Sequence, residues 1–439
     1  MDTKLLSLAA ALIAPSLSNI LNLSLKSGIV PNDWKLARVT PIYKGKGDKN
    51  DKNFYRPISV IATISMIMER EVHSQIMTYF TVHNLITIDQ FAFLKYHSTS
   101  TCLHRMMDDW YEAMNENEFI ITCFFDIQKC FDSINHRILL QKLSLYGVNG
   151  NELRWFENYL FNRTQYVACN NVLSDSRTVS TGVPQGSALG PFLFLAFIND
   201  FPQHIHNASS NLFADDASVY VTGRDLSNTV SNMQSSINQA SEWYRNNNLP
   251  VNAPKTVCML SGTECKLNRL SENEKKLNLI FNDVTLQQVS TCPYLGVQLD
   301  ENMKWSHHVQ YLCRNLSYKV SMLGRLRKIM SPVMLNRIYL TYIQPSLDYA
   351  ISVWGHCNQN FKKCVIRIQH RAARIVTGQF DYVNVRGHDL MTQLNWQSVD
   401  QRRDYFTANI MFKSINGIAP VHIRNEISLV SEIHDGNTR

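Results

Sequence analysis

Three aspartates could form a site for metal-dependent chemistry on phosphate groups. Asp215 and Asp216 stand side by side between two short apolar runs, 212–214 and 217–221, which we expect to be the strands of a hairpin with the acids at its tip. Because Asp is depleted in strands, a pair at this place needs a reason. An ordinary solvated turn is the alternative explanation.

The third acid, Asp126, follows a run of apolar and β-forming residues at 119–127 that is typical of a buried strand. A carboxylate at that place loses hydration at a high free-energy cost unless it is paired or bound to a metal ion. If neighbouring strands bring Asp126 beside Asp215 and Asp216, the three acids could hold two Mg²⁺ ions about 4 Å apart for an in-line displacement at phosphorus. Polymerases and nucleases both use this chemistry.

The elements that would position these acids form an α+β body. Residues 34–43 are expected to be extended and to lead into a basic loop at 44–49 that contains two glycines. Apolar spacing and helix-ending residues predict helices at 61–82, 101–115, 138–146 and 230–243.

The C-terminal third is predicted to be mostly helical and is strongly basic. Ser306 is expected to cap one helix, and Pro332 to begin another that ends near Pro345. Residues 301–439 contain 18 Lys and Arg against 9 Asp and Glu, whereas residues 1–300 contain 25 against 27. This charge favours a part that binds a large polyanion, with an ordinary helical domain as the alternative.

Composition limits the remaining classes. With 439 residues and 45% hydrophobic residues, the chain can bury large cores, and two or three subdomains are expected. The ten cysteines contain no Cys-x-x-Cys pair, which favours a reducing compartment. The spacing of His356, Cys357, Cys364 and His370 is looser than that of common zinc sites.

The first 25 residues are apolar enough to raise the question of a signal peptide. The apolar stretch from Leu5 to Ala14 could be a signal-peptide core, but apolar residues continue at helical spacing through Leu25, past Pro15. An amphipathic helix packed on the body is therefore the preferred interpretation. No apolar run is long enough to span a bilayer.

Short motifs surround the three acids in a fixed order over about residues 15–420. They are Trp34-Lys35, Pro41-Ile42-Tyr43-Lys44, Tyr55-Arg56-Pro57-Ile58-Ser59, Phe125-Asp126 with Phe131-Asp132, Gly182-Val183-Pro184-Gln185-Gly186-Ser187, Phe213-Ala214-Asp215-Asp216, Asn252 with Lys255-Thr256, Tyr294-Leu295-Gly296-Val297, Tyr349 with Val353-Trp354-Gly355, and Arg371-Ala372-Ala373-Arg374. Each motif alone is weak. Together they resemble the reverse transcriptases of non-LTR retrotransposons, most closely the jockey-like long interspersed elements.

The resemblance implies a right-hand polymerase fold and RNA-directed DNA polymerase activity. It implies an N-terminal helix and fingers in 1–118, a palm with an antiparallel sheet and some interleaved fingers elements in 119–300, and a basic helical thumb with a C-terminal extension in 301–439. Its partners would be an RNA template, a DNA primer, the RNA–DNA hybrid and dNTPs, with no membrane. The protein would act inside the cell, in the nucleus, and would not be secreted.

The resemblance also assigns roles to residues. Asp126 and Asp215 would bind both Mg²⁺ ions, with Asp216 and Ile127 assisting, and Lys255 would protonate the leaving pyrophosphate. Taken alone, Lys255 would be an ordinary surface lysine.

A second group of residues would contact the incoming nucleotide. Lys44, Lys46 and Arg56 would meet the triphosphate, although a lysine-glycine loop is more often a solvated turn. The ring of Phe131 would exclude a 2′-hydroxyl, with a core aromatic as the alternative. Gln185 would hydrogen-bond the nucleotide beside Gly186, where the backbone comes close.

Two departures from the family pattern matter. Leu94 stands where the second fingers motif usually has arginine, and Lys95 could compensate. The endonuclease that such elements carry ahead of the polymerase is also missing, so we expect a truncated or separately expressed copy that could not nick its own target. The alternatives to an active polymerase are a catalytically impaired remnant that only binds nucleic acid and a two-metal nuclease.

Overall fold

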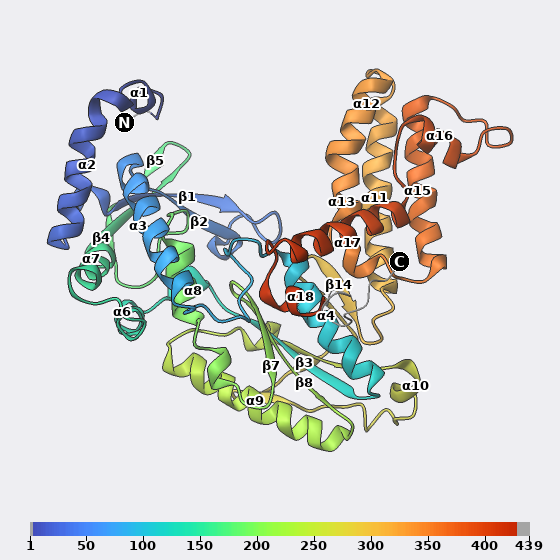
Figure 1. Ribbon diagram of the computed structural model, residues 1–439, viewed down its shortest axis with the longest axis horizontal. Coiled ribbons are helices and arrows are strands. Elements are labelled where there is room, and N and C mark those ends of the chain that lie inside the picture. Colours follow the sequence, from blue (N-terminus) through green and yellow to red (C-terminus); the bar gives the residue numbers. More distant parts are fainter. Residues whose placement is uncertain (1–2, 428–439) are drawn as a thin grey trace, which may run out of the picture.

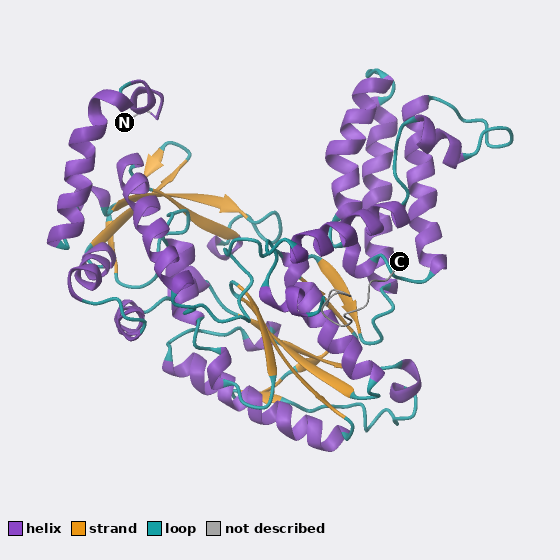
Figure 2. Cartoon of the chain, viewed as in Figure 1, coloured by secondary structure: helices purple, strands orange, loops and turns teal. Residues whose placement is uncertain are grey.

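The computed structural model describes residues 3–427 and has an α+β fold, as predicted (Figures 1 and 2). Two five-stranded sheets occupy the N-terminal and central parts, and helices form the C-terminal part. Figure 1 shows α2 at one end of the molecule, α11, α12 and α15 at the other, and the central sheet between them.

The N-terminal sheet joins segments that are far apart in the chain. β1 (Leu36–Tyr43) and β2 (Tyr55–Val60) form an antiparallel hairpin in which Tyr43 lies opposite Tyr55. β1 also pairs in parallel with β4 (Arg163–Cys169), which in turn pairs with β5 (Val172–Leu173) and β6 (Arg177–Val179). The expected extended segment at 34–43 is an inner strand of this sheet from Leu36 onward, whereas Trp34 ends a 3₁₀ turn (Asn32–Trp34).

Helices of the first half pack around one large apolar core. They include the predicted helices at 61–82 and 138–146, found as α3 (Thr63–Val82) and α6 (His136–Leu145), together with α5 (Cys130–Ser133), α7 (Gly150–Leu160) and α8 (Gly190–Ile198). In α8 every residue except Pro191 is buried. An apolar helix without a polar face is expected to be enclosed on all sides.

The N-terminal segment is helical, as predicted, but only part of it packs on the body. α1 (Thr3–Leu8) is followed by α2 (Ala10–Ser27), whose last turns lie against α7. The indole nitrogen of Trp155 donates a hydrogen bond to Ser24 Oγ at 3.1 Å. Leu12 and Leu23 remain exposed, so the apolar pattern of α2 is only partly used for packing.

The central sheet has the strand order β12-β9-β3-β8-β7. Its middle strand is β3 (Phe119–Asp126), which is antiparallel both to β8 (Asp216–Gly223) and to β9 (Val257–Ser261). β7 (Ser209–Phe213) forms a hairpin with β8, and β12 (Gln287–Gln288) lies beside β9.

Both faces of β3 are buried, because alternate side chains enter two different cores. Ile121, Cys123 and Phe125 pack into the core shared with α9 (Leu226–Asn246). Ile120 and Phe124 pack on the other side, against α4 (Thr99–Asn115) and the C-terminal helices. This explains why the strand is apolar at most positions although its neighbours are antiparallel; Thr122 is a buried polar exception.

The remaining elements extend from the central sheet. They are α10 (Glu264–Leu267), β10 (Ile280–Phe281), β11 (Val284–Thr285), the hairpin of β13 (Thr291–Tyr294) and β14 (Val297–Asp300), and then α11 (Ser306–Leu326), α12 (Pro332–Ile338), a π-helical turn (Tyr339–Ile343), α13 (Gln344–Asp348), α14 (Ile351–Trp354), α15 (Gln359–Thr377), α16 (Gly387–Gln393), α17 (Val399–Ile415) and α18 (Val421–Asn425).

One predicted helix start is wrong, and one predicted helix end is close to the observed one. Ser306 does not cap α11 but is its first residue; Trp305 precedes it with a φ of 62°. The helix that begins at Pro332 continues beyond Pro345 to Asp348 through the π-helical turn. Proline is tolerated there because it stands in the first turn of α13, where its missing N–H is not needed.

Several sequence expectations concern possible metal, redox or membrane features. All ten cysteines are free thiols. Within residues 3–427, His356, Cys357, Cys364 and His370 form no metal-binding group. Over the same residues, no helix is both long and apolar enough to cross a membrane.

Candidate active site

The central sheet brings the three candidate acids together. Asp126, the last residue of β3, lies directly opposite Asp216, the first residue of β8. Asp215 stands beside it in the tight turn from β7, where Ala214 has a φ of 55°. Directly opposed residues of antiparallel strands have Cβ atoms about 5 Å apart. Three carboxylates are therefore neighbours at one edge of the sheet.

The electrostatics of this edge favour a cation. Burial raises the pKa of Asp216 to about 6, and the charges of Asp215 and Asp126 add to the rise. Burial also raises the pKa of the Cys130 thiol, and the adjacent Asp215 carboxylate contributes. The Asp126 side chain is still 46% exposed, so it is accessible to a ligand. Mutual repulsion of carboxylates is the condition that a bound metal ion relieves.

The donors fit a hard divalent cation held jointly by protein and substrate. Ile127 and Val251 form an antiparallel bridge in which the hydrogen bonds involve the flanking residues, so the Ile127 carbonyl faces the side of β8. In residues 3–427, no group of three or more His, Cys, Asp or Glu side chains is arranged so that it could hold a metal ion by itself. Mg²⁺ usually keeps several waters and completes its shell with substrate phosphates, which suits such an open arrangement.

Lys255 lies at the same edge. Its Nζ is 4.0 Å from Asp126 Oδ2, and its side chain is 72% exposed. The segment that carries it is fixed to the end of β3, because Asn252 N donates to the Asp126 carbonyl at 2.8 Å. The hydroxyl of Thr256 accepts a hydrogen bond from Asp126 N at 3.4 Å.

The loop with Gln185 and Gly186 is held between β2 and α5. Gln185 Nε2 donates to Asp132 Oδ1 at 3.0 Å, and its carbonyl accepts a hydrogen bond from Ser59 N at 2.7 Å. Gly186 has a φ of 114°, and a Cβ there would lie 2.8 Å from the Ser59 carbonyl oxygen. Only glycine fits this conformation so close to another backbone.

The β1–β2 hairpin carries the three basic residues that were predicted to meet the triphosphate: Lys44, Lys46 and Arg56. Burial raises the pKa of Asp132. The hydrogen bond from Gln185 and the charges of Lys129 and Lys44 oppose this rise, which means that Lys44 lies near Asp132. Arg56 is exposed on the same strand face as Ile58, whose side chain approaches the position of Gly186. Lys46 is exposed between Gly45 and Gly47, both of which have a positive φ.

Phe131 is half-buried beside the Gln185 loop. Its ring centroid is 5.3 Å from that of Phe194 in α8, and its carbonyl accepts a hydrogen bond from Val183 N at 2.7 Å. Packing on Phe194 is the contact expected of a core aromatic. Phe131 belongs to the same sequence motif as Asp126. Part of its ring remains exposed and is accessible to a nucleotide.

The sequence reasoning missed several residues of this region. Asp132 was quoted only as part of a motif, yet it binds Gln185. No feature of the sequence indicated the left-handed backbone conformation of Lys129, whose φ is 46°. Glu69 was detectable in principle, because it is an acid on a helix face that otherwise buries Met68 and Val72.

The residue at the fingers departure, Leu94, is half-buried in the segment before α4. Its neighbour Lys95 has its Nζ 4.7 Å from the ring centroid of Tyr96.

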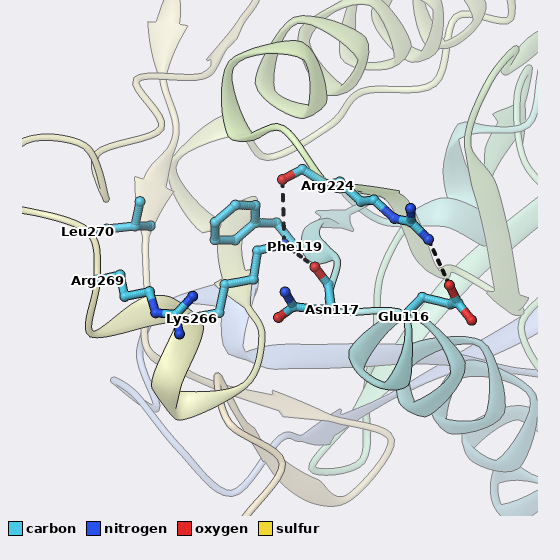
Figure 3. A pocket seen from close by; sticks show the side chains of 7 residues that line it. All are labelled: Glu116, Asn117, Phe119, Arg224, Lys266, Arg269 and Leu270. Atoms are coloured by element: carbon cyan, nitrogen blue, oxygen red, sulfur yellow. Dashed lines mark hydrogen bonds and ion pairs between the residues drawn. The ribbon is translucent and has the colours of Figure 1, made fainter.

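Two cavities lie at different ends of the central region. A cavity of about 400 Å³ adjoins the Gln185 loop and is lined by Ser59, Asp132 and Arg163. Another of about 540 Å³ lies where β3 begins, at Phe119, far from Asp126. Figure 3 shows the second cavity, with the Arg224 side chain reaching Glu116. The second cavity takes no part in the carboxylate site.

A comparison with protein families identifies the chain. The family model described as reverse transcriptase (RNA-dependent DNA polymerase) matches residues 46–299, which is more than half of the chain. The protein therefore belongs to the reverse transcriptase family and has its right-hand polymerase fold. The family depends on divalent metal ions, in agreement with the oxygen donors at the end of β3.

Curated relatives support the resemblance to mobile-element polymerases. "Probable RNA-directed DNA polymerase from transposon BS" of Drosophila melanogaster is 28% identical over 403 residues, which are 88% of this chain and 43% of the relative. "RNA-directed DNA polymerase from mobile element jockey" of the same organism is 27% identical and covers 84% of this chain and 40% of the relative. The predicted likeness to jockey-like elements is thus confirmed. The chain spans about two fifths of the length of these relatives.

Among solved structures, apo telomerase from Candida tropicalis, truncated from the C-terminal domain, is 12% identical with a TM-score of 0.42. The match covers 62% of this chain and 55% of the telomerase chain.

Proposed function

We propose that this chain is an RNA-directed DNA polymerase of a non-LTR retrotransposon. It would transfer a deoxynucleotide from a dNTP to a primer 3′-hydroxyl under the direction of an RNA template. The observation that carries the proposal is the register that sets Asp126 opposite Asp216, with Asp215 in the adjoining turn. The Gln185 loop and Lys255 lie at the same edge of the sheet.

Two Mg²⁺ ions are the proposed cofactor. Asp126 and Asp215 would hold them, assisted by Asp216 and the carbonyl of Ile127, and the bound ions would acidify the primer hydroxyl and neutralise the leaving pyrophosphate. The primer oxygen forms the new bond to the α-phosphorus while the bond to pyrophosphate breaks. Lys255 is exposed and close to Asp126, so it could supply a proton to the pyrophosphate.

The nucleotide would lie between the β1–β2 hairpin and the Gln185 loop. Lys44, whose charge acts on Asp132, and the exposed Arg56 and Lys46 would contact the triphosphate. Phe131 would rest against the sugar and disfavour a 2′-hydroxyl. Gln185 would orient the nucleotide through its side-chain amide.

We assign fingers to residues 1–118, a palm with interleaved fingers elements to 119–300, and a thumb with its extension to 301–439. An exposed face of α11 could contact the backbone of an RNA–DNA hybrid, because it combines aromatic and basic side chains at helical spacing: Tyr311, Arg314, Tyr318 and Arg325. Such contacts are sensitive to salt and independent of sequence. The polymerase would act in the nucleus.

Primer extension tests the proposal. The protein is incubated with a labelled DNA primer on an RNA template, Mg²⁺ and dNTPs, and compared with Asp215→Ala and with Asp283→Asn, a control in the β10–β11 turn. We expect extension by the parental protein and the control. Asp215→Ala should lose at least about 1000-fold in rate, because a metal ligand supplies several kcal/mol of transition-state stabilisation. Hybrid binding, measured by fluorescence anisotropy, should change little.

The alternative functions give different results in the same assay. Hybrid binding without any incorporation would favour a catalytically impaired remnant, and shortening of the labelled strand would favour a nuclease. If Asp215→Ala extends primers at the parental rate, the metal assignment is wrong.

A further inference from the structure

A buried glutamate in α3 contacts the loop that carries Gln185 and Gly186. Glu69 is only 1% exposed. Its Oε2 accepts hydrogen bonds from the backbone amides of Ala188 at 2.7 Å and Leu189 at 3.4 Å, and its Oε1 accepts one from Tyr159 Oη at 2.8 Å. Each carboxylate oxygen is therefore engaged by a donor from a different part of the chain.

A buried carboxylate loses its hydration at a high free-energy cost unless hydrogen bonds replace it. Burial raises the pKa of the Glu69 carboxyl, while the hydrogen bond from Tyr159, those from the loop amides and the charge of Arg163 oppose the rise. Arg163 is itself buried; its guanidinium lies 4.7 Å from the Tyr159 ring centroid and donates to the Tyr159 carbonyl. Glu69, Tyr159 and Arg163 thus form one enclosed polar network.

This network fixes one side of the loop, and β2 fixes the other. Ser59 N donates to the Gln185 carbonyl at the start of the loop, and Glu69 accepts from Ala188 near its end. Ser59 and Glu69 belong to consecutive elements, β2 and α3. The loop is therefore attached at both ends to one continuous segment of the fingers, while the Gln185 side chain reaches Asp132 beside the acids.

We propose that Glu69 is a positioning residue for nucleotide binding. Through the amides of Ala188 and Leu189, it holds residues 184–189 in the conformation that presents Gln185 and Gly186 to the nucleotide. It touches neither the nucleotide nor the metal ligands. This role rests on the proposed polymerase function, but the contact itself does not require catalysis.

If Glu69 positions the loop, a substitution of Glu69 should affect dNTP binding and not the chemical step. Removing the carboxylate should loosen the loop and weaken dNTP binding, while the acids at the end of β3 stay in place. The KM for dNTP should therefore rise about tenfold, which corresponds to about 1.4 kcal/mol, while kcat stays within about threefold. A general loss of stability would instead reduce the amount of active protein without changing this KM.

The test uses two variants of Glu69 and one matched control. Glu69→Met fills the space without an acceptor, and Glu69→Gln keeps one acceptor oxygen. The control, Asp200→Asn, alters another partly buried carboxylate of the same core, which pairs with Lys142 at 2.6 Å and does not touch the loop. Hydrogen exchange at the Ala188 amide and steady-state kinetics with dNTP are measured for each protein.

We expect Glu69→Met to speed exchange at Ala188 about tenfold and to raise the KM in the same proportion. Glu69→Gln should give about threefold changes, because a neutral oxygen accepts more weakly than a carboxylate. Asp200→Asn should change neither quantity. If Glu69→Met does not fold, Glu69→Gln decides by the same two measurements.

The proposal is overturned if the Glu69 variants exchange at the parental rate, or if exchange rises while the KM for dNTP stays unchanged. If the parental protein extends no primer, the polymerase proposal fails. The exchange measurement then still decides whether Glu69 holds the loop.

Discussion

Replacing Asp216 by asparagine should stabilise the metal-free protein while it impairs nucleotide addition. In the register of β3 and β8, Asp216 lies opposite Asp126 and next to Asp215 in sequence. Like charges directly opposed across a sheet destabilise it. Asparagine has nearly the same shape and removes one of the three charges.

The size of the gain follows from the pKa. Burial and the two neighbouring carboxylates raise the pKa of Asp216 to about 6, against about 3.9 in an unfolded chain. A shift of about two units corresponds to about 3 kcal/mol as an upper limit. Because more than a third of Asp216 is exposed, solvent screening reduces the expected gain to about 1 kcal/mol.

The gain should depend on pH in one direction. Between about pH 4 and pH 6 the folded protein binds more protons at Asp216 than the unfolded chain, so this residue makes stability fall as pH rises through that window. The benefit of Asp216→Asn should be absent below about pH 4 and complete above about pH 6. It should also shrink at high ionic strength, since these acids are partly exposed.

Thermal unfolding followed by intrinsic fluorescence measures the effect. At pH 8 in low salt with a chelator, we expect Asp216→Asn to raise the midpoint by about 2 °C, and the control Asp283→Asn to leave it unchanged. Millimolar Mg²⁺ should raise the midpoint of the parental protein more than that of the variant. If Asp216→Asn is destabilising at pH 8, or equally stabilising at pH 4 and pH 8, mutual repulsion of the three carboxylates does not lower the stability of the folded protein.

Two further predictions concern the nucleotide pocket. Gly186→Ala places a Cβ 2.8 Å from the Ser59 carbonyl oxygen at a φ of 114°, so it should destabilise the protein by about 1–3 kcal/mol and raise the KM for dNTP. An unchanged unfolding midpoint together with an unchanged KM would contradict this account. Phe131→Val should admit ribonucleotides, measured as the ratio of kcat/KM for dNTP and rNTP on the same template. An unchanged ratio would mean that Phe131 is only a packing residue against Phe194.

Elements with a strong local pattern were predictable from the sequence. The apolar run at 119–127 forms β3, and the β-forming segment after Asp216 forms β8. Both strands are buried on both faces, and the alternation read in the second does not correspond to one exposed face. The likeness to jockey-like polymerases was also visible in the order of the motifs, which the relatives confirm. The proposed boundaries of fingers, palm and thumb and the roles of the site residues remain predictions.

Features that depend on distant packing were not predictable. The start of α11 is set by Trp305, which is buried with its indole N–H bound to Tyr111, a contact across 194 positions. The parallel pairing of β1 with β4 joins Leu36 to Thr164 and leaves no local signature. For Glu69, the helix was predicted but its partners Tyr159 and Ala188 lie about 90 and 119 positions away.

The two-sided burial of β3 determines how much of the chain must be kept together. Ile120 and Phe124 share a core with Leu312, Leu316 and Trp354 of the C-terminal helices. In a fragment that ends near residue 300, where the family match ends, one apolar face of the sheet would be exposed to solvent. Such a face would promote self-association. The segment that carries the three aspartates therefore shares one core with the basic C-terminal part, and the two would have to be expressed together as a single folding unit.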